Sequence, residues 1–418
     1  MPISTLNEPP SHAHEGGRLF EPAVLFVSLS VAFSLIGDQA LYAILPVHFE
    51  TLGLTSLQVG VLLSINRWVR LLTNHAPERM VATYGASGLL VVALGVGAMT
   101  TGACALFPTF LALLVARAFW GCCWSFIRQI GVMTCIDVTP HDRLARVMGV
   151  FNGVFRTGSI LGCLGGALLF DAVGFRMTLG LFAGVSLLGI PCALLGRGHH
   201  GRHMRARMPR VSADATGSVT SLMVRGFVAG CAGPGLVAST LGYLLRERLG
   251  EGGQLLGTAV SVTAFSGFVL ACRHVINTIG AGPLGVLIDR FGRLRGERVA
   301  CVCAAVSLAC AGVLPGVLFP VLGVLVFFTA STAMLAVLPA EAGGRGGKAY
   351  ARYATALDLG AATGPLVGWT MIQTLDMPSA SLLLASVLYC VALGVSVRRT
   401  SGPGQGRSSL TSVESVRA

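Results

Sequence analysis

Residues 285–293 read Gly-Val-Leu-Ile-Asp-Arg-Phe-Gly-Arg, a short charged stretch between two long apolar runs. The runs, 256–280 and 299–318, each contain the roughly 20 residues that a helix needs to cross the hydrocarbon layer of a bilayer. This arrangement predicts two membrane-spanning helices that are joined by a tight, charged loop.

Ten further apolar runs of similar length fill most of the remaining chain. They are 24–47, 56–74, 86–107, 110–136, 146–170, 177–196, 220–245, 321–339, 350–373 and 380–397. Hydrophobic residues make up 53% of the chain and charged residues 11%, and the mean hydropathy is +0.74. One soluble core cannot bury so much apolar surface, so the bilayer must act as the solvent. We predict an all-α integral membrane protein with twelve transmembrane helices.

Arginine is concentrated in the loops on one side of this predicted arrangement. The most basic loop is 197–218, between the sixth and seventh spans, and the loop at 285–293 falls on the same side. Because Lys and Arg favour the cytoplasmic side of short loops, we expect both termini to be cytoplasmic. The net charge of +12 reflects this bias together with contact to lipid head groups. Since the cations are spread over membrane loops, no nucleic-acid partner is expected.

The residue types of a metal or catalytic site do not occur with suitable spacing. The twelve cysteines lie in or beside apolar spans without the spacing of zinc ligands, and we interpret them as packing residues. We interpret the histidines at 199, 200 and 203 as part of a solvated linker. No cofactor, metal or enzymatic activity is expected, and a non-transporting membrane sensor or enzyme is the alternative from another class.

Two glycine patterns of identical spacing, about two hundred residues apart, indicate an internal repeat. They are Gly158-x3-Gly162-Cys163-x2-Gly166 and Gly360-x3-Gly364-Pro365-x2-Gly368. Arg67 also precedes Pro77 by the same interval at which Arg273 precedes Pro283. Small residues let helices approach closely in lipid, which explains each pattern but not its recurrence. The repeat predicts two pseudo-symmetric six-helix bundles.

These observations divide the chain into five parts. We expect a disordered tail at 1–21, a first bundle at 22–196, a basic linker at 197–218, a second bundle at 219–397 and a tail at 398–418.

The loop at the centre of this argument resembles the G-x-L-x-D-R-x-G-R motif of the major facilitator superfamily, whose members consist of two such halves. Gly285 and Gly292 are expected to permit a tight turn. Asp289 is expected to face the positive end of a neighbouring helix, while Arg290 and Arg293 stay hydrated. The resemblance therefore implies a conformational latch in a carrier whose halves rock against each other.

Three further patterns resemble the drug:proton antiporter branch of this superfamily. They are Ile36-Gly37 followed by Ala43-Ile44-Leu45-Pro46, Arg117-x3-Gly121, and Gly149-x8-Gly158-x3-Gly162. The chain departs from that branch at Ala43 and Cys163, where proline is usual, and at 74–85, where the loop motif has lost its aspartate. These departures bear on the symmetry of the latch and on the direction of transport.

Two stretches are similar to siderophore exporters of Gram-negative bacteria of the alcaligin type. They are Gly37-Asp38-x3-Tyr42 and Asn66-Arg67-x2-Arg70-Leu-Leu-x-Asn74. The resemblance implies proton-coupled export of a small polar or anionic molecule across the bacterial inner membrane by a monomer in contact with lipids. A multidrug efflux antiporter and an organic-anion uptake symporter are the alternatives.

Charged residues inside the spans are the candidate site, because a charge at mid-bilayer costs at least about 2.5–3.5 kcal/mol unless it lines a cavity or finds a partner. Asp38 is the expected proton carrier, with Arg117 as its modulator. Burial favours the neutral carboxyl group whereas a nearby arginine favours the ionised one, so alternating between these surroundings would load and release a proton. A static ion pair that only fixes helix packing is the alternative.

The other charged residues suggest the substrate. Arg67 and Arg273 lie at equivalent positions, about 18 Å from the helix ends, and are expected to face each other across a cavity. Arginine suits carboxylate, phosphate or hydroxamate oxygens, so we expect an anionic or oxygen-rich substrate, with purely structural arginines as the alternative. Arg156 and Asp358 are expected to form a salt bridge between the fifth and eleventh helices. The remaining expected cavity residues are Tyr42, Asn66, Arg70, Trp124 and Arg128.

Overall fold

The fold is described from a computed structural model. It describes residues 22–140, 143–196, 219–250, 254–255, 258–259 and 261–398. The predicted tail at 1–21 and the linker at 197–218 with its three histidines lie outside the described residues, as does the predicted tail at 398–418 except for Arg398, which ends a helix.

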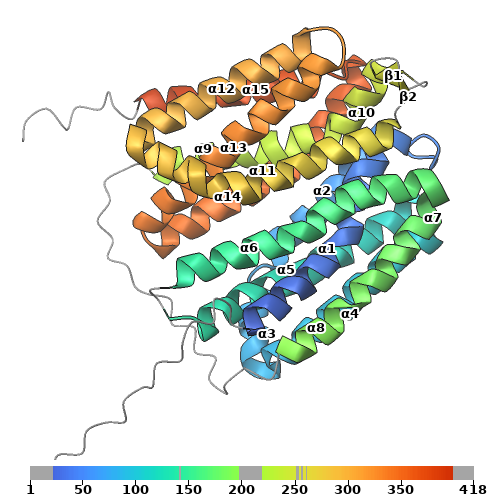
Figure 1. Ribbon diagram of the computed structural model, residues 1–418, viewed down its shortest axis with the longest axis vertical. Helices are drawn as coiled ribbons and strands as arrows, with labels where there is room; N and C mark the ends of the chain where they lie inside the picture. The colour runs from blue at the N-terminus through green and yellow to red at the C-terminus, as the bar shows by residue number, and fades with distance from the viewer. Residues whose placement is uncertain are drawn as a thin grey trace, which may run out of the picture.

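The first half consists of helices joined by short turns (Figure 1). They are α1 (Pro22–His48), α2 (Ser56–Thr73), α3 (Ala76–Tyr84), α4 (Ala86–Leu106), α5 (Phe110–Val138), α6 (Leu144–Ile160), the π-helical η1 (Leu161–Gly165), α7 (Gly166–Leu187) and α8 (Gly189–Gly196). The backbone reverses inside α7 at Gly174, where φ is 77°. That residue separates the fifth crossing from the sixth.

The second half repeats this plan. Its elements are α9 (Val219–Gly230), the π-helical η3 (Cys231–Val237), α10 (Ala238–Leu249), the short antiparallel strands β1 (Gln254–Leu255) and β2 (Thr258–Ala259), α11 (Val262–Phe291), α12 (Arg293–Val313), α13 (Leu318–Gly344), α14 (Gly347–Leu375) and α15 (Ala380–Arg398). The segments α9, η3 and α10 follow one another directly and form a single crossing.

The predicted twelve-helix membrane fold is confirmed. Within the described residues, nine helical stretches are long and apolar enough to span a membrane, and one of these, Arg146–Gly196, contains two crossings. The helices α2 and α14 supply the remaining two. They are more polar because they carry the charged cavity residues, including Arg67 and Arg70 on α2 and Asp358 on α14.

The bundle has two ends, which we name from the chain path. The linker end is where α8 ends at Gly196 and α9 begins at Val219, and the far end is where α1 ends at His48 and α10 ends at Leu249. Figure 1 places the linker end on the left and β1 and β2 at the far end on the right. Every crossing joins these two ends.

The eighth crossing differs from the predicted span. Helix α11 begins six residues later than expected, because the Ser261 side chain caps it by accepting a hydrogen bond from the Ala264 amide. It then continues past Pro283 and Gly285 to Phe291. Gly285 therefore does not form the expected turn; the chain turns at Gly292, where φ is 89°. Gly85 ends α3 in the first half in the same way, with φ at 80°.

The two glycine patterns pack against the first helix of their own half. A Cβ atom on Gly158 would overlap the Ala32 carbonyl group of α1, and one on Gly360 would overlap the Phe227 carbonyl group of α9. The fifth helix therefore lies directly on the first, and the eleventh lies on the seventh. This shared packing is the physical reason for the recurrence of the pattern.

A second pair of glycines joins the two halves. A Cβ atom on Gly60 of α2 would lie 2.8 Å from the Trp369 Cβ atom of α14. A Cβ atom on Gly267 of α11 would lie 2.6 Å from the Ala167 Cβ atom of α7. The second helix thus packs on the eleventh and the eighth on the fifth. The expectation that the fifth and eleventh helices are neighbours is wrong.

Candidate proton and substrate site

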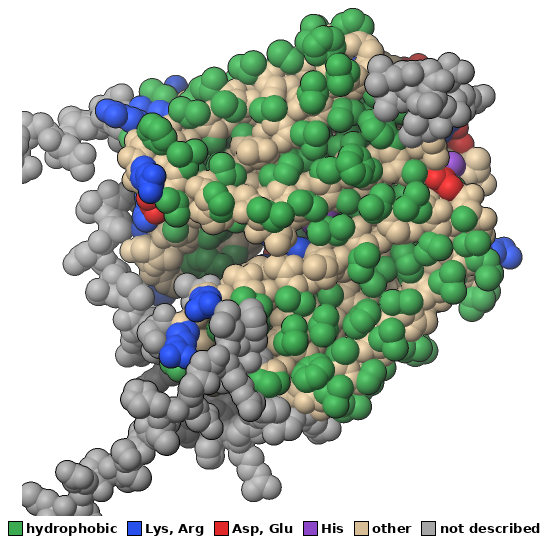
Figure 2. All heavy atoms as spheres, in the orientation of Figure 1, with side chains coloured by type: hydrophobic (Ala, Val, Ile, Leu, Met, Phe, Trp, Pro, Cys, Tyr) green, Lys and Arg blue, Asp and Glu red, His purple; other side chains and the backbone are tan. Residues whose placement is uncertain are grey.

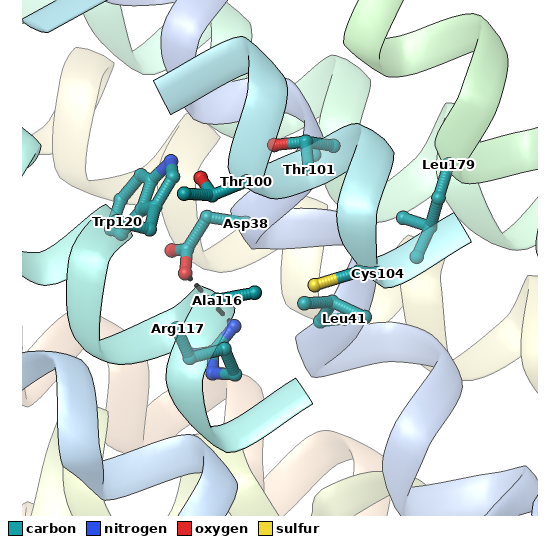
Figure 3. A pocket seen from close by; sticks show the side chains of 10 residues that line it. Asp38, Leu41, Thr100, Thr101, Cys104, Ala116, Arg117, Trp120 and Leu179 are labelled. Atoms are coloured by element: carbon teal, nitrogen blue, oxygen red, sulfur yellow. Dashed lines mark ion pairs between the residues drawn. The ribbon is translucent and has the colours of Figure 1, made fainter. Parts of the chain in front are cut away.

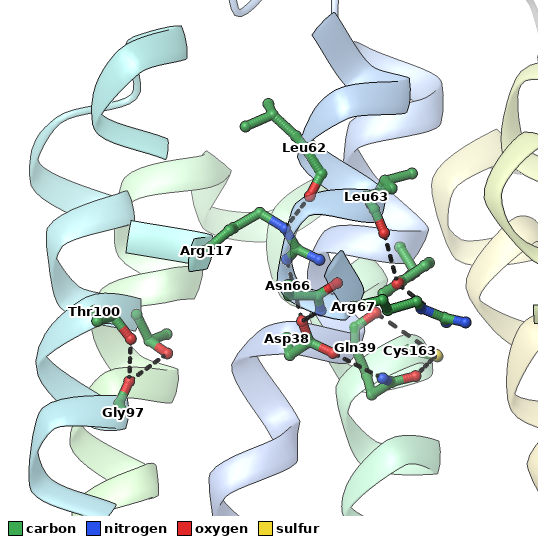
Figure 4. A network of polar contacts seen from close by, with 12 residues as sticks. Asp38, Gln39, Leu62, Leu63, Asn66, Arg67, Gly97, Thr100, Arg117 and Cys163 are labelled. Carbon is green, nitrogen blue, oxygen red and sulfur yellow. Dashed lines mark hydrogen bonds and ion pairs between the residues drawn. The ribbon is translucent and has the colours of Figure 1, made fainter. Parts of the chain in front are cut away.

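A buried ion pair links α1 to α5. The Asp38 Oδ1 atom lies 3.1 Å from the Arg117 Nη1 atom, and the two side chains are 4% and 3% exposed. Arg117 also donates from Nε to the Leu62 carbonyl oxygen on α2. The structure thus brings together the two residues that were predicted to handle the proton, as Figure 4 shows.

Two amide side chains hold the same carboxylate group. Asn66 donates to Asp38 Oδ1 over 3.2 Å, and Gln39 donates to Oδ2 over 3.0 Å. Both carboxylate oxygens therefore accept a hydrogen bond, which compensates for the loss of water on burial. Gln39 was missed in the sequence because an amide inside an apolar span carries no charge to flag it.

Tyr42 connects this pair to the cavity arginines. Its hydroxyl group donates to the Leu63 carbonyl oxygen over 3.1 Å and accepts from Arg67 Nη2 over 3.2 Å. The Arg67 and Arg117 guanidinium groups lie 5.8 and 5.7 Å from the centre of the Tyr42 ring. The Tyr42 side chain therefore couples the position of Arg67 to the charge of Asp38, because both Arg67 and Arg117 contact it.

A cavity of about 150 Å³ opens beside the ion pair. Its wall belongs to the first half: Leu35, Asp38, Gln39, Tyr42, Asn66, Arg67, Arg70, Trp120, Trp124, Phe155 and Ser159. Trp120 and Trp124 stack on each other with ring centres 5.5 Å apart. Trp124 thus lines the cavity as predicted from the sequence.

The surroundings of this cavity are rich in arginine. Arg273 of α11 lies within electrostatic reach of Arg67 and Arg156. Arg128 lies within electrostatic reach of Arg70 and Arg156. The two acids that were predicted near the cavity, Asp38 and Asp358, each form an ion pair with another arginine, Arg117 and Arg70. Arg67, Arg128, Arg156 and Arg273 thus leave the region with an excess of positive charge.

Asp358 does not pair with Arg156 as expected. Its Oδ1 atom lies 3.0 Å from Arg70 Nη2, and its Oδ2 atom accepts from Asn74 over 3.5 Å. The reason is the packing of α14 on α2, which places Asp358 opposite the last turns of α2. Arg156 lies instead over the Phe155 ring, at 5.9 Å from its centre.

The predicted latch is local in this structure. Asp289 pairs over 2.9 Å with Arg293, four residues further along the chain, and both side chains are more than half exposed. Its partner Arg293 is the first residue of α12, so the pair joins the end of α11 to the start of the next helix. Arg290 is exposed, as expected for a hydrated residue.

A buried charge cluster in the second half was missed. Arg225 of α9 is fully buried and pairs with Glu297 over 2.7 Å and with Glu341 over 2.9 Å, while Arg345 pairs with Glu341 over 2.6 Å. The cluster ties α9, α12 and α13 together near the linker end. Arg225 lies inside the seventh predicted span, so the rule that flagged Arg117 would also have found it.

The two halves are joined at the far end. Arg246 of α10 pairs with Glu50 over 2.6 Å and donates to the Val47 carbonyl oxygen over 3.1 Å. The Leu57 amide donates to the Gln373 side chain over 3.0 Å. Figure 2 shows a hollow between the halves at the opposite, linker end. The cavity is therefore closed toward the far end and approached from the linker end.

Comparison with known sequences supports this architecture. A sequence profile of the Major Facilitator Superfamily matches residues 27–365. Multidrug resistance protein MdtG of Enterobacter lignolyticus is 24% identical over 398 residues, which cover 88% of this chain and 89% of that protein. An uncharacterised transporter of the same superfamily from Methanocaldococcus jannaschii is 24% identical over 179 residues, which are 43% of this chain and 45% of that protein. The chain thus spans about half the length of that archaeal relative.

A solved structure has the same fold. The crystal structure of a bacterial homologue of the human lysosomal transporter Spinster, in an inward-facing and occupied conformation, superposes with a TM-score of 0.74. The sequences are 14% identical, and the match covers 91% of this chain and 98% of the other. Given the profile match over most of its length and this shared fold, the chain belongs to the major facilitator superfamily and is a transporter, not an enzyme.

Proposed function

We propose that this protein exports a small anionic or oxygen-rich organic molecule in exchange for protons. The observation that carries the proposal is the buried Asp38–Arg117 pair, whose carboxylate borders a cavity together with Arg67. Arg273 lies within electrostatic reach of Arg67 and Arg156, and none of these three arginines forms an ion pair with an acid among the described residues. A carboxylate that can lose its arginine partner is suited to carry a proton. Arginines in excess are suited to hold substrate oxygens.

The chemistry of the cycle follows from this arrangement. When Asp38 gains a proton, its attraction for Arg117 weakens, and Arg117 and Arg67 shift over the Tyr42 ring that they share. When Asp38 loses the proton, the ion pair forms again. Arg67 also borders the substrate cavity, so the charge of Asp38 alters the affinity of the cavity for an anion.

We propose that the linker end faces the cytoplasm of a bacterial cell and that the protein functions as a monomer in the inner membrane. In Figure 2 most visible Lys and Arg side chains lie at the linker end, and apolar side chains cover the middle of the face. This distribution agrees with the cytoplasmic preference of cations. In this orientation the described conformation is open to the inside, ready to take up a substrate for export.

The decisive experiment measures transport by purified protein in sealed vesicles with an imposed pH gradient. A siderophore with hydroxamate and carboxylate groups is the first substrate to test. We expect Asp38→Asn to abolish gradient-driven transport, because the amide cannot carry a proton. Asp171→Asn, which changes an exposed acid of the same half, is the matched control and should transport normally. Full gradient-driven activity of Asp38→Asn would refute proton carriage by this residue.

The same vesicles test the substrate class. Arg67→Gln and Arg273→Gln should each weaken anion binding by roughly tenfold or more, since a hydrogen bond to a charged group contributes about 1.5–3 kcal/mol. Quenching of the fluorescence of Trp120 and Trp124 provides the binding signal, because both line the cavity. Unchanged binding in both variants would contradict the assignment of these arginines.

Multidrug efflux is the second candidate. The stacked Trp120 and Trp124 rings form an aromatic wall that suits flat apolar molecules, and a relative is named a multidrug resistance protein. Lipophilic cations would favour buried acids without partners over an excess of arginines. Competition between an organic anion and a lipophilic cation for the fluorescence signal distinguishes the two candidates.

A further inference from the structure

A second, much smaller pocket also touches Asp38. It measures about 10 Å³ and lies inside the first half, between α1, α4, α5 and α7. Its lining includes Asp38, Arg117, Thr100, Thr101 and Cys104, as Figure 3 shows. Its volume is close to the minimum of about 10–15 Å³ that holds one water molecule.

The pocket offers the partners that a water molecule needs. The Nη2 atom of Arg117 is buried and has no hydrogen-bond partner among the described residues, so it is free to donate. The hydroxyl groups of Thr100 and Thr101 both donate to the Gly97 carbonyl oxygen, over 2.7 and 3.2 Å, so toward the pocket they can only accept. A water molecule could accept from Arg117 and donate to a threonine and to Asp38, which makes the usual three bonds.

This pocket lies closer to the far end of the bundle than to the linker end. Thr101 lies about 8 Å from the end of α4 at Leu106, and Ala116 lies about 9 Å from the start of α5 at Phe110. Both helix ends are at the far end. The substrate cavity, in contrast, is approached from the linker end. Asp38 therefore separates a water-sized space toward one side of the membrane from the substrate cavity toward the other.

We propose that this pocket holds an ordered water molecule that passes protons to Asp38 from the far end, along a route inside the first half that the substrate does not share. The inference rests on the proposed function, because it requires Asp38 to carry the proton. In the transfer step, an O–H bond of this water breaks as a bond forms to a carboxylate oxygen of Asp38, while a proton from water at the far end bonds to the oxygen atom of the pocket water, so that a neutral water molecule remains in the pocket. The proton later leaves Asp38 to water in the linker-end cavity.

The surroundings of Asp38 support a proton route that is separate from the substrate cavity. The ionisable groups near the carboxylate include Arg117 on α5, Cys104 on α4 and Cys163 on η1, while Tyr42 and Arg67 line the substrate cavity with it. Thr101 is packed so closely on α1 that a Cβ atom on Gly37 would lie 2.5 Å from its methyl carbon. This contact leaves room for water but not for a substrate. A separate route lets a proton reach Asp38 while the substrate occupies the cavity.

The test compares two kinds of transport in the same vesicles. Gradient-driven transport requires proton movement, whereas counterflow exchanges labelled for unlabelled substrate without it. The double variant Thr100→Val/Thr101→Val keeps the side-chain shapes but removes the pocket hydroxyl groups. We expect gradient-driven transport to fall roughly five- to tenfold, as for the loss of a hydrogen bond in a transfer step, while counterflow stays unchanged. Thr100→Ser/Thr101→Ser should restore the driven rate.

Thr178→Val is the matched control. Thr178 is a buried threonine of the same half whose hydroxyl group donates over 2.8 Å to the carbonyl oxygen four residues earlier, like Thr101, but it does not line the pocket. It should leave both kinds of transport unchanged. Normal driven transport in the double valine variant would overturn the inference, as would an equal loss of driven transport and counterflow. If instead Asp38→Asn transports normally under the gradient, the proposed function itself fails.

Discussion

At the scale of single residues, the free-energy cost of losing a charged partner depends on how far the ion pair is buried. Arg70 and Asp358 are 13% and 18% exposed and connect the two halves at the last turn of α2. Asp289 and Arg293 form an ion pair of similar length but are more than 60% exposed. The desolvation of the first pair makes the loss of one partner costly, whereas water replaces a partner in the second.

Asp358→Asn should therefore destabilise the protein by about 3 kcal/mol, because Arg70 stays buried without its ion-pair partner. Asp289→Asn, the exposed control, should change stability by less than about 1 kcal/mol. Thermal unfolding in detergent measures both. The swap Arg70→Asp/Asp358→Arg should recover most of the loss. If Asp358→Asn proves as stable as the control, the inter-half pair has no structural role.

At the scale of helices, the glycine patterns set how closely each bundle packs. In lipid no hydrophobic effect drives helices together, so close van der Waals contact must hold them. The fifth helix lies on α1 at Gly158, and α14 lies on α9 at Gly360. The π-helical segments η1 and η3 interrupt the regular α-helix at these two helix–helix contacts, which we call the glycine seams. We infer that both glycine seams bring the backbones close at the expense of ideal helix geometry.

Gly158→Ala and Gly360→Ala should each destabilise the protein by roughly 1–3 kcal/mol, since the added methyl group meets a backbone carbonyl group that cannot move aside. Gly149→Ala is the control on α6, because nothing lies within 4 Å of its added Cβ atom. It should be neutral or stabilising, by up to about 1 kcal/mol, through better helix propensity. Equal melting temperatures for all three variants would show that the glycine seams tolerate extra volume.

At the scale of the whole molecule, closure at the far end accompanies opening at the linker end. Arg246 binds Glu50 and the Val47 carbonyl group across the halves. Arg248, on the same helix, binds the Leu314 and Gly312 carbonyl groups within the second half only. Only the first of these contacts must break when the halves rock.

Arg246→Ala should therefore shift the population toward the conformation that is open at the far end, by about fivefold for a loss of about 1 kcal/mol. Hydrogen–deuterium exchange should become faster around residues 49–55. It should become slower at the linker end, where the opening between the halves closes. Arg248→Ala should leave the exchange pattern unchanged. Similar exchange in both variants would mean that Arg246 does not hold the far end closed.

The amino-acid sequence alone was enough to predict the twelve crossings and the repeat, because the length of an apolar run and the spacing of its glycines are properties of each single helix. It also identified Asp38 and Arg117, since a charge inside an apolar span stands out wherever its partner lies. Which charged residues pair with each other depends on how the helices pack. Asp358 finds Arg70 rather than Arg156 because α14 packs on α2, and helix pairing across the halves depends on surface shapes that no single span encodes. The water-sized pocket behind Asp38 likewise exists only where four helices pack together.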